Sequence, residues 1–213
     1  MRPIHVAVAF DRRFVPFAGV AIASLIASGD TARRHVLHIF VADVPRSELA
    51  WLSAISHPGW SIRVYDLPSL ATLARPGYPI HPVTYARLLL PDLLPDVERL
   101  LYLDVDIVAT APWSALHDCD LSGQPLGAVT DFAFEAGRVV QQRVLEGGCA
   151  GLPAEAYCTN VLGLPPRGHG SAYINAGVLV MDLDRLRAMI SHGRLETSLR
   201  AKLGSTGSAI SAA

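Results

Sequence analysis

Two aspartates, Asp104 and Asp106, are separated by a single residue in the apolar segment LLYLDVDIVA, residues 100–109. If the chain is extended there, both side chains point to the same face. Two carboxylates placed close together in apolar surroundings repel each other and lose hydration, and a hard divalent cation with oxygen ligands removes both costs. We therefore predict a Mn²⁺ or Mg²⁺ site that can hold a diphosphate. The simpler alternative is a pair of solvated aspartates in a turn.

Two further predicted strands also end on a carboxylate, at Asp11 and at Asp131. In open α/β sheets, ligands bind at the carboxyl ends of the strands. Either residue alone is more simply a turn residue or a helix cap. Together with the aspartate pair after residue 103, they predict a ligand site at one edge of the sheet.

Other metal and phosphate motifs fail on spacing. Counted from Asp104, an EF-hand needs Gly and Glu where Ala109 and Ala115 stand. The chain has no Walker loop, no H-E-x-x-H, no G-x-S-x-G and no dinucleotide fingerprint. The three cysteines form no C-x-x-C pair and suit reduced thiols in a cytoplasm: Cys119, Cys149 and Cys158.

Apolar strands that alternate with helices predict an α/β fold with a mostly parallel sheet. We expect strands at 4–10, 35–42, 61–67, 100–103, 125–130 and 174–183. We expect helices at 17–27, 46–55, 85–94, 136–145 and 185–190. Residues 68–83, and the stretch from 146 to 172, are expected to be loops. One domain is expected over 1–203, and 204–213 is expected to be an unstructured tail.

The composition excludes several classes of protein. The chain has 213 residues, 51% of them hydrophobic and 17% charged, which excludes intrinsic disorder and a coiled coil. The net charge of −1 does not indicate the basic surface that nucleic-acid-binding proteins have. The longest apolar stretch, 14–27, is too short to span a bilayer, and the N-terminus lacks the pattern of a signal peptide.

Four segments, taken in order, resemble a known family. They are AVAFDRRFVPFAGVAIASL (7–25), TYARLLLPDLLPDVERLLYLDVDIVA (84–109), LGAVTDF (126–132) and YINAGVLVMDLDRLR (173–187). The second joins an Arg-bearing helix to the D-x-D strand. The chain resembles glycosyltransferase family 8, which includes bacterial lipopolysaccharide galactosyl- and glucosyltransferases and has the glycogenins as relatives.

The resemblance implies a GT-A-type, Rossmann-like fold and a retaining hexosyltransferase. It implies a UDP-sugar donor (UDP-galactose or UDP-glucose), a glycan or lipopolysaccharide acceptor, and Mn²⁺ or Mg²⁺ held by Asp104 and Asp106. It also implies a cytoplasmic location, with room for peripheral contact with the inner membrane through a C-terminal part that this sequence lacks. A developing negative charge on departing UDP would be stabilised by the metal and by a cation such as Arg87.

Further roles follow from matching positions. Asp11 matches the acidic residue that reads the uracil ring, and Arg13 stands where the family often has Asn. The resemblance also implies that the Val105 backbone lies beside the ribose, and that Asp131 and Asn175 match residues facing the transferred sugar. The resemblance assigns no catalytic nucleophile. It implies the following donor-binding residues: Asp11, Arg87, Asp104, Val105, Asp106, Asp131 and Asn175.

Family members continue with a D-Q-D-type segment and then H-x-x-G-x-x-K-P-W, whose His is the third metal ligand. Neither segment occurs in this sequence, so we expect a C-terminally truncated chain that transfers sugar poorly. A non-catalytic UDP-sugar-binding pseudoenzyme is the first alternative.

A phosphatase of the haloacid dehalogenase type is the second alternative, because residues 104–108 also satisfy D-x-D-x-[TV]. That mechanism needs a downstream lysine, and the sole lysine is Lys202, directly before the expected tail. The glycosyltransferase interpretation is therefore favoured.

Overall fold

The structure is a computed structural model that describes residues 2–55, 57–67, 82–140, 143, 151–161, 163, 166 and 173–191. Two compact units make up the chain. The first takes the residues up to 130 together with 174–184, and the second takes 131–173 and the residues from 185 onward. The predicted tail and most of the predicted 68–83 loop lie outside the described residues.

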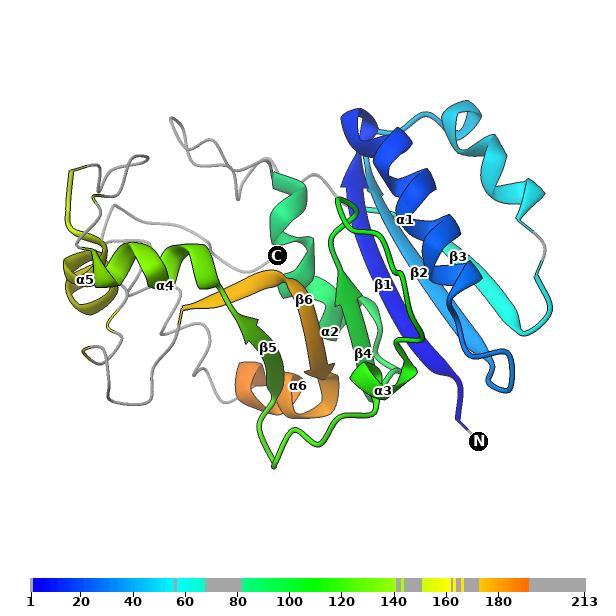
Figure 1. Ribbon diagram of the computed structural model, residues 1–213. Coiled ribbons are helices and arrows are strands. Elements are labelled where there is room, and N and C mark those ends of the chain that lie inside the picture. The colour runs from blue at the N-terminus through cyan, green and yellow to red at the C-terminus, as the bar shows by residue number, and fades with distance from the viewer. Residues whose placement is uncertain are drawn as a thin grey trace. The chain divides into compact units, whose positions relative to one another are not determined.

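The first unit is built on a six-stranded sheet in the order β3-β2-β1-β4-β6-β5 (Figure 1). Strands β1 to β4 are parallel to one another, and β6 runs antiparallel to both of its neighbours, β4 and β5. The predicted mixed α/β class with a mostly parallel sheet is confirmed. The strands are β1 Ile4–Asp11, β2 His35–Ala42, β3 Trp60–Asp66, β4 Arg99–Leu103, β5 Leu126–Thr130 and β6 Ile174–Asp182.

The central strands are almost wholly buried because they are covered on both faces. Every residue of β1 except His5 is buried, and so is every residue of β2 except Ala42. Such continuous apolar runs are typical of parallel strands. Helix α1, Val15–Ala27, lies along these strands and buries Ala18, Ala21, Ile22 and Leu25 in the same apolar core (Figure 1).

The predicted helix at 46–55 is a 3₁₀ helix, Arg46–Ala54. Its buried side chains, Leu49 and Leu52, stand three residues apart, which is the repeat of a 3₁₀ helix. Farther along, a 3₁₀ turn, Pro82–Tyr85, leads into α2, Ala86–Leu93. The remaining helices are α3 Ser114–His117, α4 Phe132–Val139, α5 Ala154–Ala156 and α6 Leu183–Ser191. Of these, α3 and α5 were not predicted from the sequence.

Helix α4 of the second unit begins four residues before the predicted start at 136. The Asp131 carboxylate accepts a hydrogen bond of 2.9 Å from the backbone N–H of Phe134 and so caps the helix. A π-helical turn, Tyr157–Val161, follows α5 within the stretch that was expected to be a loop. The cap agrees with the simpler interpretation given above for Asp131, whereas the apolar pattern missed the start of α4, because Phe132 is largely exposed.

The direction of β6 brings its amino end to the edge where β1 and β4 have their carboxyl ends. Leu103, the last residue of β4, pairs with Val178 of β6. Residues 174–177, which come before Val178, therefore lie beside the chain that leaves β4. This edge of the sheet collects side chains from strands that run in both directions.

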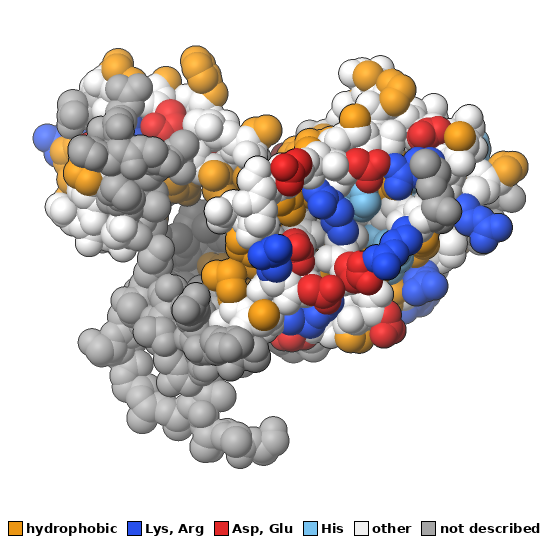
Figure 2. All heavy atoms as spheres, turned by 90° about the horizontal axis from the view of Figure 1, so that it is seen from below, with side chains coloured by type: hydrophobic (Ala, Val, Ile, Leu, Met, Phe, Trp, Pro, Cys, Tyr) orange, Lys and Arg blue, Asp and Glu red, His pale blue; other side chains and the backbone are white. Residues whose placement is uncertain are grey.

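The face seen in Figure 2 carries Arg side chains interspersed with Asp and Glu, in keeping with the net charge of −1. No helix within the described ranges combines the length and apolar character that crossing a bilayer requires.

Candidate functional site

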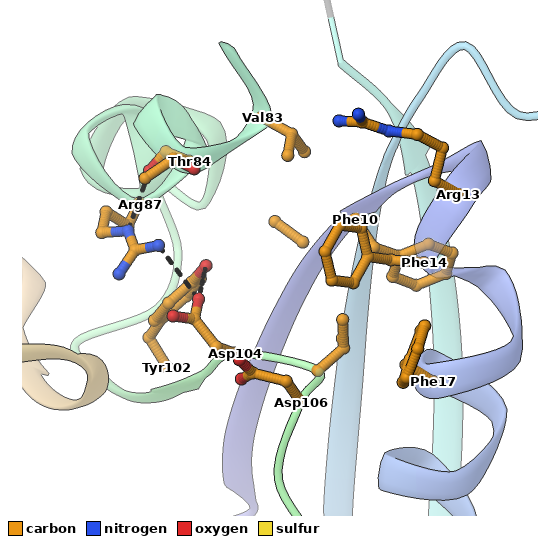
Figure 3. A pocket seen from close by; sticks show the side chains of 12 residues that line it. Phe10, Arg13, Phe14, Phe17, Val83, Thr84, Arg87, Tyr102, Asp104 and Asp106 are labelled. Atoms are coloured by element: carbon orange, nitrogen blue, oxygen red, sulfur yellow. Dashed lines mark hydrogen bonds and ion pairs between the residues drawn. The ribbon is translucent and has the colours of Figure 1, made fainter. Parts of the chain in front are cut away.

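A cavity of about 610 Å³ opens at the carboxyl ends of β1 and β4 (Figure 3). One wall is polar and carries Arg87, Tyr102, Asp104 and Asp106. The opposite wall is apolar, and Arg13 lies at the rim. The apolar wall is formed by Phe10, Phe14 and Phe17, and Val83 lies on the turn that leads into α2. Ligand sites commonly have this size and combine apolar surface with a few convergent polar groups.

The Asp104 carboxylate is held at one oxygen. Its Oδ1 accepts a hydrogen bond of 2.8 Å from the Tyr102 hydroxyl and one of 3.0 Å from Arg87 Nη2 (Figure 3). Its backbone N–H donates to the Gly177 carbonyl at 2.8 Å. With Oδ1 held by two donors, Asp104 has a fixed orientation in the wall of the cavity.

Tyr102 is the buried member of this group, with 1% of its surface exposed. Burial is the largest cause that raises the pKa of its hydroxyl, and the Arg87 charge opposes the rise only in part. The hydroxyl therefore stays protonated at neutral pH and donates to Asp104. The Arg87 guanidinium carbon lies 4.8 Å from the centre of the Tyr102 ring, within range of a cation–π contact.

Arg87 comes from the first turn of α2 and is fixed by three partners. Nε donates to the Thr84 carbonyl at 2.8 Å, Nη1 donates to the Ala176 carbonyl, and Nη2 donates to Asp104. A guanidinium has five N–H donors, so these bonds leave one hydrogen on each terminal nitrogen. Arg87 is thus oriented in the cavity wall with donors to spare for an anion.

The chain bends at Val105 and Asp106 instead of staying extended, so the condition under which the D-x-D pattern places both carboxylates on one face is not met. Val105 is buried and Asp106 is exposed in the cavity wall, directly after β4 ends at Leu103. Within the described residues, no group of three or more His, Cys, Asp or Glu is arranged to hold a metal ion. Two carboxylates nevertheless suit Mg²⁺ or Mn²⁺, which often keep several ligand oxygens from water and substrate phosphates.

Asn175 lies beside Asp104, across Gly177. Its Oδ1 accepts a hydrogen bond of 2.8 Å from the Gly177 N–H, which leaves the amide NH₂ as a donor. A methyl group on Gly177 would lie 2.9 Å from Asp104 Oδ2 and 3.1 Å from Asn175 Oδ1. The structure therefore brings together five of the residues singled out in the sequence: Arg87, Asp104, Val105, Asp106 and Asn175.

The two other predicted carboxylates make local contacts. Asp11 is 4% exposed and bonds to Arg13, and it is not among the residues that line the cavity. Asp131 belongs to the second unit and caps α4. Their predicted roles toward a base and a sugar stay predictions.

The aromatic wall is the feature that sequence reasoning missed. The Phe14 and Phe17 rings are 5.6 Å apart between centroids, and both are exposed, whereas Phe10 is buried. Phe14 is the residue before α1 and Phe17 lies in its first turn, and this spacing of three residues places them on one face. The sequence feature that could have revealed this wall is that the helix is almost entirely apolar, although the sheet can bury only one of its sides.

The chain matches the family described as Glycosyl transferase family 8 over residues 5–206. It belongs to this family. The GT-A fold that the resemblance implied is confirmed, because the family's solved glycosyltransferases share this architecture.

Three relatives show the extent of the similarity. The probable galacturonosyltransferase-like 9 of Arabidopsis thaliana is 25% identical over 205 residues, which are 91% of this chain and 49% of that protein. The galactosyltransferase LgtC, solved with donor and acceptor sugar analogues, is 25% identical with a TM-score of 0.68, over 92% of this chain and 65% of LgtC. The bifunctional glycosyltransferase WbbM shares the fold, with 22% identity and a TM-score of 0.77, over 93% of this chain and 35% of WbbM.

This family 8 chain thus spans about half the length of the plant relative and about a third of WbbM. Family membership supports a role in glycosyl transfer. The donor, the metal and the acceptor are taken up below as proposals.

Proposed function

We propose that the chain binds a UDP-linked hexose together with Mn²⁺ or Mg²⁺ and transfers the hexose, with retention, to a saccharide acceptor. One observation carries the proposal most directly. Two carboxylates from the segment after β4 and an arginine from α2 converge on a single cavity whose other wall is aromatic. A nucleoside diphosphate sugar has an anionic centre and a flat base, and this cavity offers a surface for each.

The diphosphate is assigned to the polar wall. Asp104 and Asp106 would hold the metal, which would neutralise phosphate charge, and Arg87 has N–H donors left on both terminal nitrogens. Arg87 and the metal would then stabilise the charge that develops on UDP as the sugar departs. Tyr102 holds the Asp104 carboxylate in place for this work.

The hexose is assigned to the Asn175 side of Asp104. The Asn175 amide keeps a donor after its bond to Gly177, and hydroxyls of a sugar accept as well as donate. The base is assigned to the wall of Phe10, Phe14 and Phe17, because Phe14 and Phe17 expose aromatic surface on which a flat ring stacks well. Asp131 remains a proposed contact of the sugar.

For the donor and the acceptor we propose a chemical class of molecule. UDP-galactose and UDP-glucose are the proposed donors, and a glycan such as a bacterial lipopolysaccharide is the proposed acceptor, in a cytoplasmic setting next to the inner membrane. LgtC, crystallised with donor and acceptor sugar analogues, supports this class. Retention at the anomeric carbon rests on the family resemblance of the four sequence segments.

Calorimetric titration of UDP with and without Mn²⁺ tests the donor site. We expect Mn²⁺ to raise UDP affinity, and we expect Asp106→Asn to abolish that increase. Asp92→Asn is the matched control, because Asp92 is exposed on α2 and does not line the cavity. UDP binding that is indifferent to Mn²⁺ would refute the metal assignment.

Transfer is tested separately from binding. UDP release from UDP-galactose and UDP-glucose is measured with and without a saccharide acceptor. Acceptor-stimulated release that requires Asp106 supports transfer, and metal-coupled binding without any release supports donor binding alone.

A further inference from the structure

The two edge strands of the sheet differ in the side chains that they expose. Strand β3 forms one edge and β5 forms the other (Figure 1). The exposed residues of β3 include Arg63 and Asp66, and charged side chains of this kind discourage an edge strand from pairing with another chain. The exposed residues of β5 are Ala128, Val129 and Thr130, and none of them is charged. The β5 edge therefore lacks the protection that the β3 edge has.

The backbone of β5 presents hydrogen-bonding groups on the side away from β6. The Asp182 N–H donates to the Pro125 carbonyl at 3.0 Å, so these two residues face each other as a hydrogen-bonded pair. Such pairs alternate along an antiparallel ladder, so Leu126 and Ala128 turn their N–H and C=O groups away from β6. Among the residues that the structure describes, no strand pairs with β5 on that side. A further strand would find these groups available.

An apolar hollow of about 250 Å³ lies beside β5. Gly127 lines it, on the same face of the sheet as its β6 partner Val180. A methyl group on Gly127 would lie 2.6 Å from Leu121 Cδ2, so the Leu121 side chain packs directly over the glycine. Val129 points to the same face and is 53% exposed. This face of β5 thus carries a residue without a side chain and, two positions on, a large exposed one.

We infer that β5 pairs with β5 of a second copy of this chain, antiparallel about a two-fold axis at Ala128. Ala128 then faces Ala128 of the second copy, and their outward N–H and C=O groups bond to each other. Gly127 faces Val129 of the second copy, whose side chain lies against the apolar hollow. A surface that matches itself in this way suits the two-fold symmetry that most protein dimers have.

Charge and size support a second copy as the occupant and indicate how tightly it binds. Residues 121–130 contain no charged side chain, so two copies bring no like charges together along this edge. Stable interfaces use roughly 20–30 residues on each side, whereas β5 has 5. The dimer should therefore be weak and should dissociate on dilution.

Sedimentation velocity of the wild-type chain, from micromolar to near-millimolar concentration, tests the inference. The average mass should rise from that of one chain toward that of two. Ala128→Lys should raise the dissociation constant at least several-fold, because it places two like charges directly opposite each other. Ser61→Lys is the matched control, since Ser61 is an exposed residue of the β3 edge. A wild-type chain that stays a monomer would overturn the inference, and so would equal dimerisation of Ala128→Lys.

A charge exchange tests the pairing itself. Ala128→Glu alone should also stay monomeric, whereas a mixture of Ala128→Lys and Ala128→Glu should dimerise, because opposite charges then face each other. A mixture no heavier than either variant alone would overturn the proposed pairing. Hydrogen exchange of the wild-type chain gives a result even if a variant does not fold. Residues 126–130 should exchange more slowly at high concentration while 60–66 do not change, and equal exchange of 126–130 at both concentrations would also overturn it.

Discussion

The carbonyl of Gly177 accepts the backbone N–H of Asp104 at 2.8 Å, and the Cα of Gly177 lies against the Asp104 carboxylate. This contact joins the amino end of β6 to the segment that leaves β4. It leaves no room for a side chain, since a methyl group at this position would lie 2.9 Å from Asp104 Oδ2. A glycine is needed at position 177 because the β6 backbone approaches the Asp104 carboxylate so closely.

Gly177→Ala should therefore weaken the donor site. Arg87 and Tyr102 hold the other oxygen of Asp104, so the added methyl group must shift the carboxylate or the β6 backbone. We expect Mn²⁺-dependent UDP affinity to fall by roughly tenfold or more, given the sensitivity of such sites to small displacements. Gly19→Ala in α1 is the control, because a methyl group there meets nothing within 4 Å. Equal UDP affinity in both variants would show that the contact does not matter for binding.

Tyr102→Phe should lower Mn²⁺-dependent UDP affinity several-fold without unfolding the chain. The variant removes the hydroxyl that donates to Asp104 at 2.8 Å, and one such hydrogen bond contributes about 1 kcal/mol. Tyr65→Phe is the matched control, because its hydroxyl bonds to His38 at 3.0 Å and not to a cavity residue. Calorimetry on both variants checks this, and a similar loss in Tyr65→Phe would mean that the effect is on stability.

Much of this site was predictable, because apolar strands followed by carboxylates mark the ligand edge of a parallel sheet. That pattern located Asp104 and Asp106. It did not predict that β6 is antiparallel, so the contact between Gly177 and Asp104 could not be foreseen. Strand direction depends on the chain crossings rather than on any local sequence pattern.

The pairing of Asp11 with Arg13 was also beyond the sequence. The role predicted for Asp11 toward a base stays a prediction, and the 3₁₀ turn Arg12–Phe14 after β1 places Arg13 where it bonds to both carboxylate oxygens. The outcome depends on the geometry of three successive residues. Side chains so close in sequence compete for the same exposed position, and residue type alone does not decide which of them reaches the cavity.

Acid should destabilise the fold through His38, which lies fully buried in β2. Burial is the main cause that lowers the pKa of His38 to about 3, and the nearby His5 and Arg63 lower it further. The ring bonds to His5 at 3.0 Å and to Tyr65 at 3.0 Å. In the unfolded chain the same imidazole binds a proton near pH 6.5, so between these pH values the unfolded state binds more protons.

The free energy of unfolding should therefore be insensitive to His38 above pH 6.5 and should fall as the pH drops from 6.5 toward 3. One such group contributes at most about 1.4 kcal/mol per pH unit. Urea unfolding between pH 4 and 8 measures this slope, and His38→Gln should reduce it. His57→Gln, at an exposed position, is the control. A slope unchanged by His38→Gln would assign the acid sensitivity to other groups.

Arg138→Met should destabilise the second unit strongly. The Arg138 side chain is fully buried, and it donates to Glu135 at 2.8 Å and to Glu155 at 2.7 Å. Its loss removes the buried cation to which both partly buried carboxylates bond, and breaking a buried pair in this way costs about 3 kcal/mol or more. Arg2→Met is the control, since it removes an exposed ion pair with Glu98, and exposed pairs contribute at most about 1 kcal/mol. Urea unfolding of both variants measures the difference, and equal stabilities would show that Arg138 does not hold α4 and α5 together.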